Sequence, residues 1–383
     1  PIFKAGDDLV QMIPDLLDRF FEQENIEIGH KDVVAITESV VARTQGNYVT
    51  IDQVAKDLNP DFAGKELGVI LPILSRNRFA IVLRAIASAD VEKVILQLSL
   101  PSDEVGNHLI TLDQLDNAGI NPWRETISEA KYRELFGYQK HEFTGIDYVA
   151  YYKELVEDCG KKCEIIFSND PLAILAHTKY VINCDIHTRK RTKNLLLKNG
   201  AECVRSLDDI MNAPIDGSGY NEKYGLLGSN KSTEDQIKLF PRECSPLVEA
   251  IQAEVKKRTG KTIEVMVYGD GAFKDPVGKI WELADPVVSP GYTSGLEGTP
   301  NELKLKYLAD NDFKDLRGDE LKEAIKEAIK SKSDNLVGQM ATQGTTPRQL
   351  TDLLGSLCDL TSGSGDKGTP VVYIQGYFDN YTN

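Results

Sequence analysis

Two short polar segments with residue types suited to metal binding follow a predicted strand over residues 263–268. The strand breaks into Gly269-Asp270-Gly271, and Lys274-Asp275-Pro276 comes shortly afterwards. Glycine lets the backbone approach a ligand closely, and carboxylate oxygens are suitable ligands for Mg²⁺ or Mn²⁺. Gly-Asp-Gly is also typical of a tight turn, so the sequence leaves two interpretations of Asp270, a metal ligand or a turn residue.

A second segment with residues suited to phosphate binding comes directly after residues 32–37, an apolar run that predicts a buried strand. We expect a helix to begin near Glu38, where Ser39 is placed to cap the helix or to contact a phosphate oxygen. Arg43 follows about one turn later, and its guanidinium can bind phosphate in a bidentate manner. The alternative is a capped core helix with a surface arginine.

Two other groups of basic residues can be interpreted either as ligand-binding residues or as solvent-exposed surface charges. Residues 185–193 place a run of basic side chains at the start of a predicted helix, where an anion would fit, but charged residues also solvate helices. Arg76, Arg78 and Arg84 alternate with apolar positions. We expect these three arginines to form a solvated face or to pair with the excess acidic residues.

The composition is that of an acidic globular protein of 383 residues, 41% of them hydrophobic and 27% charged. The formal net charge of −15 argues against a nucleic-acid partner and against an anionic membrane surface. No apolar run approaches the roughly 18 residues that a membrane-spanning helix requires, and no signal peptide is visible. The six cysteines and five histidines show no metal-ligand spacing, so we expect reduced thiols in a cytoplasmic protein.

The predicted elements that position these segments belong to an α/β protein with α+β mixed sheets. Between residues 90 and 215, strands and helices of similar length alternate, which predicts a small α/β unit with a parallel sheet. We therefore expect a core formed by residues 1–89 and 216–383, interrupted by an inserted α/β domain over residues 90–215.

Three collinear segments resemble the coenzyme F420-0:gamma-glutamyl ligase family. The first comprises residues 1–9, Pro-Ile-Phe-Lys-Ala-Gly-Asp-Asp-Leu, and residues 32–46, which are similar to the family's P-L-I-x-x-G-D-D-L and V-S-K-A-E-G-R segments. The second, residues 225–278, is similar to its N-A-G-I-D-x-S-N segment and to a strand that ends in a metal-binding Asp-Thr pair. The third, residues 350–376, is similar to A-D-E-I-A, a glycine-rich loop and I-P-x-V-V-V-R-G. The inserted region has no counterpart that we can match.

The resemblance implies the F420-0:gamma-glutamyl ligase type of fold and a GTP-dependent ligase, in which the amine of L-glutamate attacks an activated small-molecule acid to form an amide. It also implies GTP or another nucleotide, Mg²⁺ or Mn²⁺, K⁺ as an optional further cation, and a homodimer. The positions that match the family's nucleotide-binding residues are Ile2, Phe3, Lys4, Glu38, Ser39, Arg43 and Ser232. The positions assigned to its metal ligands are Asp270 and Asn230, and no catalytic residue is assigned.

The chain departs from the family pattern at both metal positions. Ser229-Asn230 replaces one metal-binding Asp and offers neutral oxygens. The Asp-Thr pair is replaced by Gly269-Asp270, and a displacement by one residue turns a strand's side chain to the other face. The family lysine is Arg43, which keeps the charge and the affinity for phosphate. These departures motivate an alternative function, a non-catalytic relative that binds a ligand or nucleotide after losing a metal ligand.

Overall fold

The computed structural model describes residues 2–269, 273–274, 281–282, 289–333, 335–342, 349–362 and 369–379. The candidate metal ligand Asp270 lies outside these residues. The chain divides into two compact units, of which the large unit contains residues 1–7, 38–242 and 270–287. The small unit contains residues 8–37, 243–269 and 288–383. Both combine helices with sheets, as expected for an α/β protein.

A six-stranded sheet with the order β5-β6-β4-β3-β7-β8 forms the centre of the large unit. Its strands are β3 (Glu66–Ile70), β4 (Lys93–Leu98), β5 (Ile127–Ser128), β6 (Lys162–Phe167), β7 (Tyr180–Asn183) and β8 (Cys203–Ser206). All pairs are parallel except β5 with β6. The chain starts at β3, builds outward through β4 to β6, and returns to add β7 and β8 on the other side. This is the order of doubly wound nucleotide-binding sheets.

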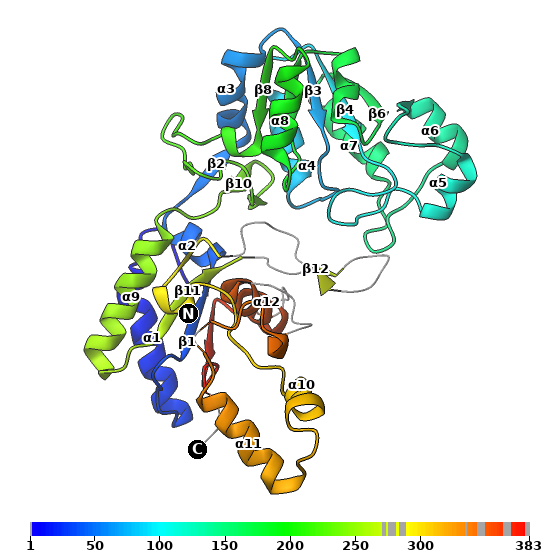
Figure 1. The fold of residues 1–383 in the computed structure, drawn as a ribbon. Helices are drawn as coiled ribbons and strands as arrows, with labels where there is room; N and C mark the ends of the chain where they lie inside the picture. The colour runs from blue at the N-terminus through cyan, green and yellow to red at the C-terminus, as the bar shows by residue number, and fades with distance from the viewer. Residues whose placement is uncertain are drawn as a thin grey trace. The chain divides into compact units, whose positions relative to one another are not determined.

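The parallel sheet predicted for residues 90–215 is present, and its central strand β3 precedes residue 90. The division of the chain at residues 89 and 215 stays a prediction. Helices α3 (Ile51–Phe62), α4 (Phe79–Ser88) and α7 (Tyr148–Asp158) share a core cluster on one face of the sheet. Helix α8 (Arg189–Lys198) and a 3-10 turn over Pro171–Ala176 cover the other face (Figure 1). Buried β-branched residues point to both faces, as is typical of parallel strands.

Helices α5 (Leu112–Ala118) and α6 (Glu129–Phe136) lie between β4 and β6 in the chain.

The start of α3 illustrates how the local sequence determines where a helix begins. Thr50 and Gln53 form a capping box, in which each side chain bonds to the other residue's backbone N–H. Apolar residues at helical spacing then bury the face of α3 that packs against α4.

A small antiparallel sheet in the large unit joins β2 (Tyr48–Thr50), β10 (Gln236–Lys238) and β9 (Asn230–Lys231). Lys238 is opposite Tyr48 and Asn230, so these three side chains share one face. The other face carries Val49, Ile237 and Lys231, of which Val49 and Ile237 are part of the main core. The sheet therefore has two faces with different surroundings.

The small unit is built around a sheet with the order β14-β11-β1-β15. Its strands are β1 (Val33–Thr37), β11 (Glu264–Tyr268), β14 (Gly291–Tyr292) and β15 (Val371–Ile374), and its longer helices are α1 (Leu9–Glu24), α9 (Cys244–Thr259), α11 (Gly318–Lys330) and α12 (Leu350–Ser362). Helices α1 and α9 lie side by side (Figure 1). The predicted strand over 263–268 is present as β11, and all five of its residues are buried.

The described chain also contains α10 (Leu305–Tyr307), β12 (Phe273–Lys274) and β13 (Trp281–Glu282). Short 3-10 or π-helical turns cover Leu207–Asp209, Ser294–Leu296, Leu308–Asp312 and Met340–Thr342. None of the helices in the described part of the chain combines the length and the apolar character needed to cross a bilayer. All six cysteines are free thiols, and burial raises the pKa of the Cys163 thiol to about 12. Burial and neighbouring acidic groups therefore keep this thiol protonated at neutral pH.

Candidate functional site

Helix α2 (Glu38–Thr44) begins directly after β1, where the sequence predicts a helix start. Its inward side buries Glu38, Val40, Val41, Ala42 and Thr44. Ser39 and Arg43 are exposed, and because they lie four positions apart, they share one side of the helix. Among the described residues, the Arg43 guanidinium has no hydrogen-bond or ion-pair partner. The structure thus brings these two predicted phosphate-binding residues together on an open helix face.

The N-terminal segment is attached to the other end of α2. The backbone N–H of Gly6 donates to the Thr44 carbonyl at 2.8 Å, and Gly6 has a φ of +88°, which glycine adopts without strain. Phe3 is buried, whereas Ile2 and Lys4 are exposed. The Lys4 backbone N–H donates to Asp7 Oδ2 at 2.7 Å, so its side chain is not tied to this turn. The predicted residues at positions 2–4 therefore lie beside the helix that carries Ser39 and Arg43.

A buried ion pair fixes the start of α2. Lys238 Nζ on β10 donates to Glu38 Oε1 at 2.9 Å, and the two side chains are 12% and 7% exposed. Removing two charges from water is costly, so such a pair is stable only with good geometry. Lys238 engages the Glu38 carboxylate, and the place of Glu38 beside a nucleotide stays a prediction.

Asn230 joins this group through the register of the small sheet. It is half-buried on β9, directly opposite Lys238, and therefore on the same face as the Glu38–Lys238 pair. Ser232 is exposed in the turn after β9, and its backbone N–H donates to the Gln236 carbonyl at 2.9 Å. No contact within the described ranges joins Ser232 to α2. The structure thus links Glu38 with Asn230, and it leaves Ser232 on the hairpin turn.

Sequence reasoning missed the residues that hold this group together. Lys238 was hidden in the apolar run over residues 237–241, where a charged residue with buried neighbours was the available signal. Asn47 is 1% exposed, its amide donates to the Phe240 carbonyl at 2.7 Å, and its side-chain oxygen accepts the N–H of Tyr220 at 3.0 Å. Asn221 donates to the Phe240 carbonyl from the other side at 3.1 Å. These amides position β10 against β2 and the end of α2.

A metal ion would find few ligands among the described residues. They contain no group of three or more His, Cys, Asp or Glu side chains that would hold one. The Asn230 amide offers one neutral oxygen, and the carboxylate of Asp270 belongs to a segment that the structure does not describe. Mg²⁺ commonly binds through one or two protein ligands together with waters and substrate phosphates. The described residues therefore do not form a metal cage of their own, and a metal at this site stays a prediction.

The basic segment at residues 185–193 is satisfied by acidic residues of the same unit. Asp185 accepts hydrogen bonds from the Thr188 backbone at 2.8 Å and from the Thr192 hydroxyl at 2.6 Å. Arg189 pairs with Asp208 at 2.9 Å. The start of α8 is thus closed by the chain's own carboxylate, which favours the solvated-helix interpretation of this segment.

Two comparisons with known proteins bear on this geometry. The family model described as F420-0:Gamma-glutamyl ligase matches residues 1–376, and this range includes both compact units and the central α/β region. None of the curated proteins compared with the chain matches it. The match therefore rests on the pattern of a whole family, and the residues around α2 and β9 fall inside it.

Proposed function

Since the chain belongs to the F420-0:gamma-glutamyl ligase family, we propose that it is a nucleotide- and metal-dependent ligase that joins the amine of an amino acid, such as L-glutamate, to a small acid. Family membership supports a gamma-glutamyl ligase type of function. GTP, Mg²⁺ or Mn²⁺, K⁺, a homodimer and a cytoplasmic location belong to the proposal. The acid itself is left open.

The observation that carries the proposal is the Glu38–Lys238 pair. It holds β10, whose neighbouring strand β9 bears Asn230, against the start of α2, while Ser39 and Arg43 stay exposed on the same helix. A phosphate group on this face would receive a bidentate guanidinium from Arg43 and a hydroxyl from Ser39. Lys4 would add a second cation from the attached N-terminal segment. In this arrangement Lys238 is a positioning residue and does not itself contact the nucleotide.

The proposed reaction transfers the terminal phosphoryl group of the nucleotide to the carboxylate of the acid. The amine then attacks the activated carbonyl carbon, the amide bond forms, and phosphate leaves with the electrons of the broken C–O bond. Arg43 and Lys4 would stabilise charge on the phosphoryl oxygens during the transfer. A bound Mg²⁺ or Mn²⁺, held by Asn230 and Asp270, would supply further charge stabilisation.

A non-catalytic binding function is the second candidate, and the metal positions favour it. Asn230 offers a neutral oxygen where the family has a carboxylate, and Asp270 is displaced by one residue from the family's other metal position. Such a protein would bind nucleotide without hydrolysing it or forming an amide. Binding and turnover must therefore be measured separately.

Thermal-shift measurements with GTP, ATP or GDP, each with Mg²⁺ or Mn²⁺, test the binding step. We expect at least one nucleotide–metal pair to raise the melting temperature, and Arg43→Gln to abolish that rise. Arg124→Gln is the matched control, because Arg124 is exposed in the same unit and has no side-chain partner in the described ranges. No stabilisation by any pair would overturn the proposal. Stabilisation without phosphate release, in the presence of L-glutamate and a panel of acids, would select the non-catalytic function.

A further inference from the structure

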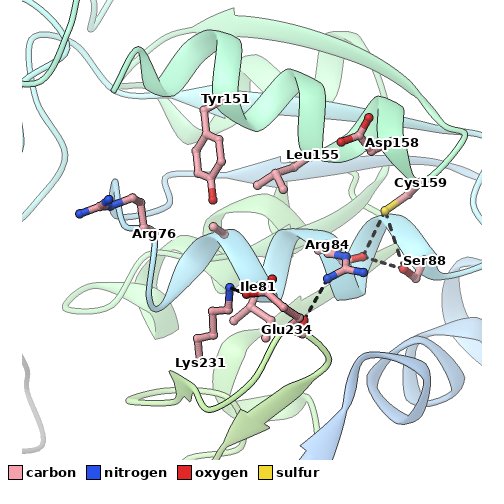
Figure 2. A pocket seen from close by; sticks show the side chains of 11 residues that line it. Arg76, Ile81, Arg84, Ser88, Tyr151, Leu155, Asp158, Cys159, Lys231 and Glu234 are labelled. Atoms are coloured by element: carbon pink, nitrogen blue, oxygen red, sulfur yellow. Dashed lines mark hydrogen bonds and ion pairs between the residues drawn. The ribbon is translucent and has the colours of Figure 1, made fainter. Parts of the chain in front are cut away.

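A second pocket in the large unit lies between α4, α7 and the turn that follows β9. It has a volume of about 490 Å³, which is within the roughly 300–1,000 Å³ of typical small-molecule sites. Figure 2 shows Tyr151 and Leu155 extending from α7 towards α4, with Arg84 and Lys231 beside Glu234 on the other side. The lining residues come from three segments, and none of them belongs to the candidate nucleotide site.

The lining carries both cations and carboxylates. Arg76, Arg84 and Lys231 line the pocket together with Asp158 and Glu234. Arg84 is also paired with the Asp235 carboxylate, so three cations and three carboxylates meet around this pocket, in a chain whose formal net charge is −15. Arginine and lysine lining one pocket are typical of sites for carboxylates and phosphates.

The chain's own acidic turn occupies two of these cations. Lys231 Nζ lies 2.6 Å from Glu234 Oε1, and Arg84 Nη2 lies 3.3 Å from Asp235 Oδ1. Glu234 and Asp235 are 78% and 73% exposed, so both pairs lie close to solvent. Exposed ion pairs contribute little to stability because solvent screens both charges. An incoming anion can therefore replace these carboxylates at small cost.

The opposite wall offers contact for an organic body. Ile81 on α4 and Leu155 on α7 are apolar, and the Tyr151 ring lines the same pocket, with its centre 5.7 Å from that of the Tyr152 ring. The Tyr151 hydroxyl has no hydrogen bond within the described part of the chain, and in Figure 2 it points towards α4. The apolar or aromatic part of a ligand would thus contact this wall, and its anionic group would contact the cations on the opposite wall.

The small sheet separates this pocket from the candidate nucleotide site. Asn230 and Lys231 are neighbours on β9, so their side chains point to opposite faces. Asn230 shares its face with Lys238, whereas Lys231 shares the other face with Ile237. A ligand held by Lys231 therefore does not meet a nucleotide on the Glu38–Lys238 side.

We propose that this pocket binds a small organic anion, a carboxylate or phosphate ester with an apolar or aromatic body. The anionic group takes the place of the Glu234 carboxylate on Lys231 and of the Asp235 carboxylate on Arg84. The apolar or aromatic part of the ligand packs against Tyr151, Ile81 and Leu155. This site is separate from the proposed ligase site and adds a second ligand to the protein.

Isothermal titration calorimetry on the full chain tests this site with phenyl phosphate, benzoate and inorganic phosphate as probes. We expect saturable binding of phenyl phosphate or benzoate, with a Kd at least tenfold lower than that of inorganic phosphate. Only the first two probes have an aromatic ring that can pack against the apolar side of the pocket. Arg84→Gln and Lys231→Gln should each raise Kd at least tenfold. Glu234→Gln should lower Kd several-fold, because it removes the internal competitor. Saturable binding of only phenyl phosphate, or of only benzoate, would support the proposal and identify the preferred anionic group.

Lys56→Gln is the matched control. Lys56 lies 2.6 Å from Asp216 in a solvent-exposed ion pair of the same unit, and it does not line the pocket. The Kd of this variant should therefore equal that of the wild type. Circular dichroism melts establish whether each variant folds. If Arg84→Gln does not fold, Lys231→Gln and Glu234→Gln are sufficient to test the proposal. The proposal is overturned if neither organic anion binds saturably, or if Lys231→Gln binds as the wild type does. Nucleotide-induced stabilisation should persist in these variants, which separates this site from the ligase site.

Discussion

Lys238 Nζ donates a hydrogen bond of 2.9 Å to Glu38 Oε1, although 200 positions separate the two residues in the chain. This contact ties the first turn of α2 to the hairpin that carries Asn230. Both side chains are largely excluded from water, so the pair is held in one geometry. The candidate site therefore depends on a contact that neither segment provides alone.

Replacing Lys238 with methionine should destabilise the protein strongly. Lys238→Met removes the ammonium that offsets the buried Glu38 carboxylate, and breaking a buried pair costs roughly 3 kcal/mol or more. The free energy of unfolding from urea titration measures this loss. Lys231→Met on the neighbouring strand is the matched control, because its partner Glu234 is 78% exposed, and it should cost less than about 1 kcal/mol. Equal losses in the two variants would contradict the assigned burial of the Glu38–Lys238 pair.

Arg43→Gln should weaken nucleotide binding and leave the free protein's stability almost unchanged. A charge-assisted hydrogen bond contributes about 1.5–3 kcal/mol, which corresponds to roughly a 10- to 100-fold rise in Kd. An exposed side chain without a described partner should change the unfolding free energy by less than about 0.5 kcal/mol. Isothermal titration calorimetry, in which GTP is added to the protein in the presence of Mg²⁺, measures the change in Kd. A normal Kd would remove Arg43 from the site.

The pH dependence of stability should report on Asp103. Burial raises the pKa of the Asp103 carboxyl to about 6, against the hydrogen bonds it accepts from Leu74, Val105 and Asn107. A raised folded-state pKa means that the folded state binds the proton more tightly. The contribution of Asp103 is therefore fully present below about pH 4 and is lost as the pH rises through 6.

Asp103→Asn isolates this effect, because asparagine keeps one acceptor oxygen and does not titrate. Relative to the variant, the wild type should lose about 2 kcal/mol of unfolding free energy between pH 4 and pH 7. Urea titrations of both proteins at several pH values measure the difference in unfolding free energy. The contributions of the other carboxylates are the same in both proteins and cancel in this difference. Parallel stability curves for the two proteins would show that the pKa of Asp103 is not raised.

Gly219→Ala should lower the melting temperature through a backbone clash. A Cβ at this position would lie 2.5 Å from Asn47 Oδ1 and 2.7 Å from the Tyr48 backbone N. The Gly219 N–H also donates to the Tyr48 carbonyl at 2.8 Å, so the two segments cannot separate freely. Overpacking of this kind costs about 1–3 kcal/mol, which differential scanning calorimetry would detect. An unchanged melting temperature would mean that β2 and the Gly219 segment separate more easily than the structure indicates.

Local patterns predicted the elements, and long-range pairing decided how they combine. The helix start at Glu38 and the strand at β11 follow from apolar runs that end in polar residues, so both were visible in the sequence. The family resemblance based on three collinear segments is confirmed by the model that matches residues 1–376. The pairing of β3 with β7, which places Gly68 opposite Val181, joins segments more than 100 positions apart, and periodicity carries no information about it.

The same limit applies to the side chains of the two proposed sites. Arg84 was expected to be solvated or to pair with excess acid, and its contact with Asp235 agrees with that expectation. The pocket beside it depends on α7 and the hairpin turn packing near α4, which no local pattern specifies. Lys238 was missed because an isolated lysine in an apolar run has no visible partner. Asp270, the first candidate in the sequence, lies outside the described residues.

The division of the chain between the two units has a consequence for synthesis. Strand β1 pairs with β11 and β15, which follow it by more than 200 residues, so a ribosome makes β1 long before its partners. Nearly all of the large unit, residues 38–242, is translated in that interval. Because domains generally fold as units during translation, the large unit can complete its parallel sheet first. Strand β1 then has to remain unpaired until β11 and β15 have been made.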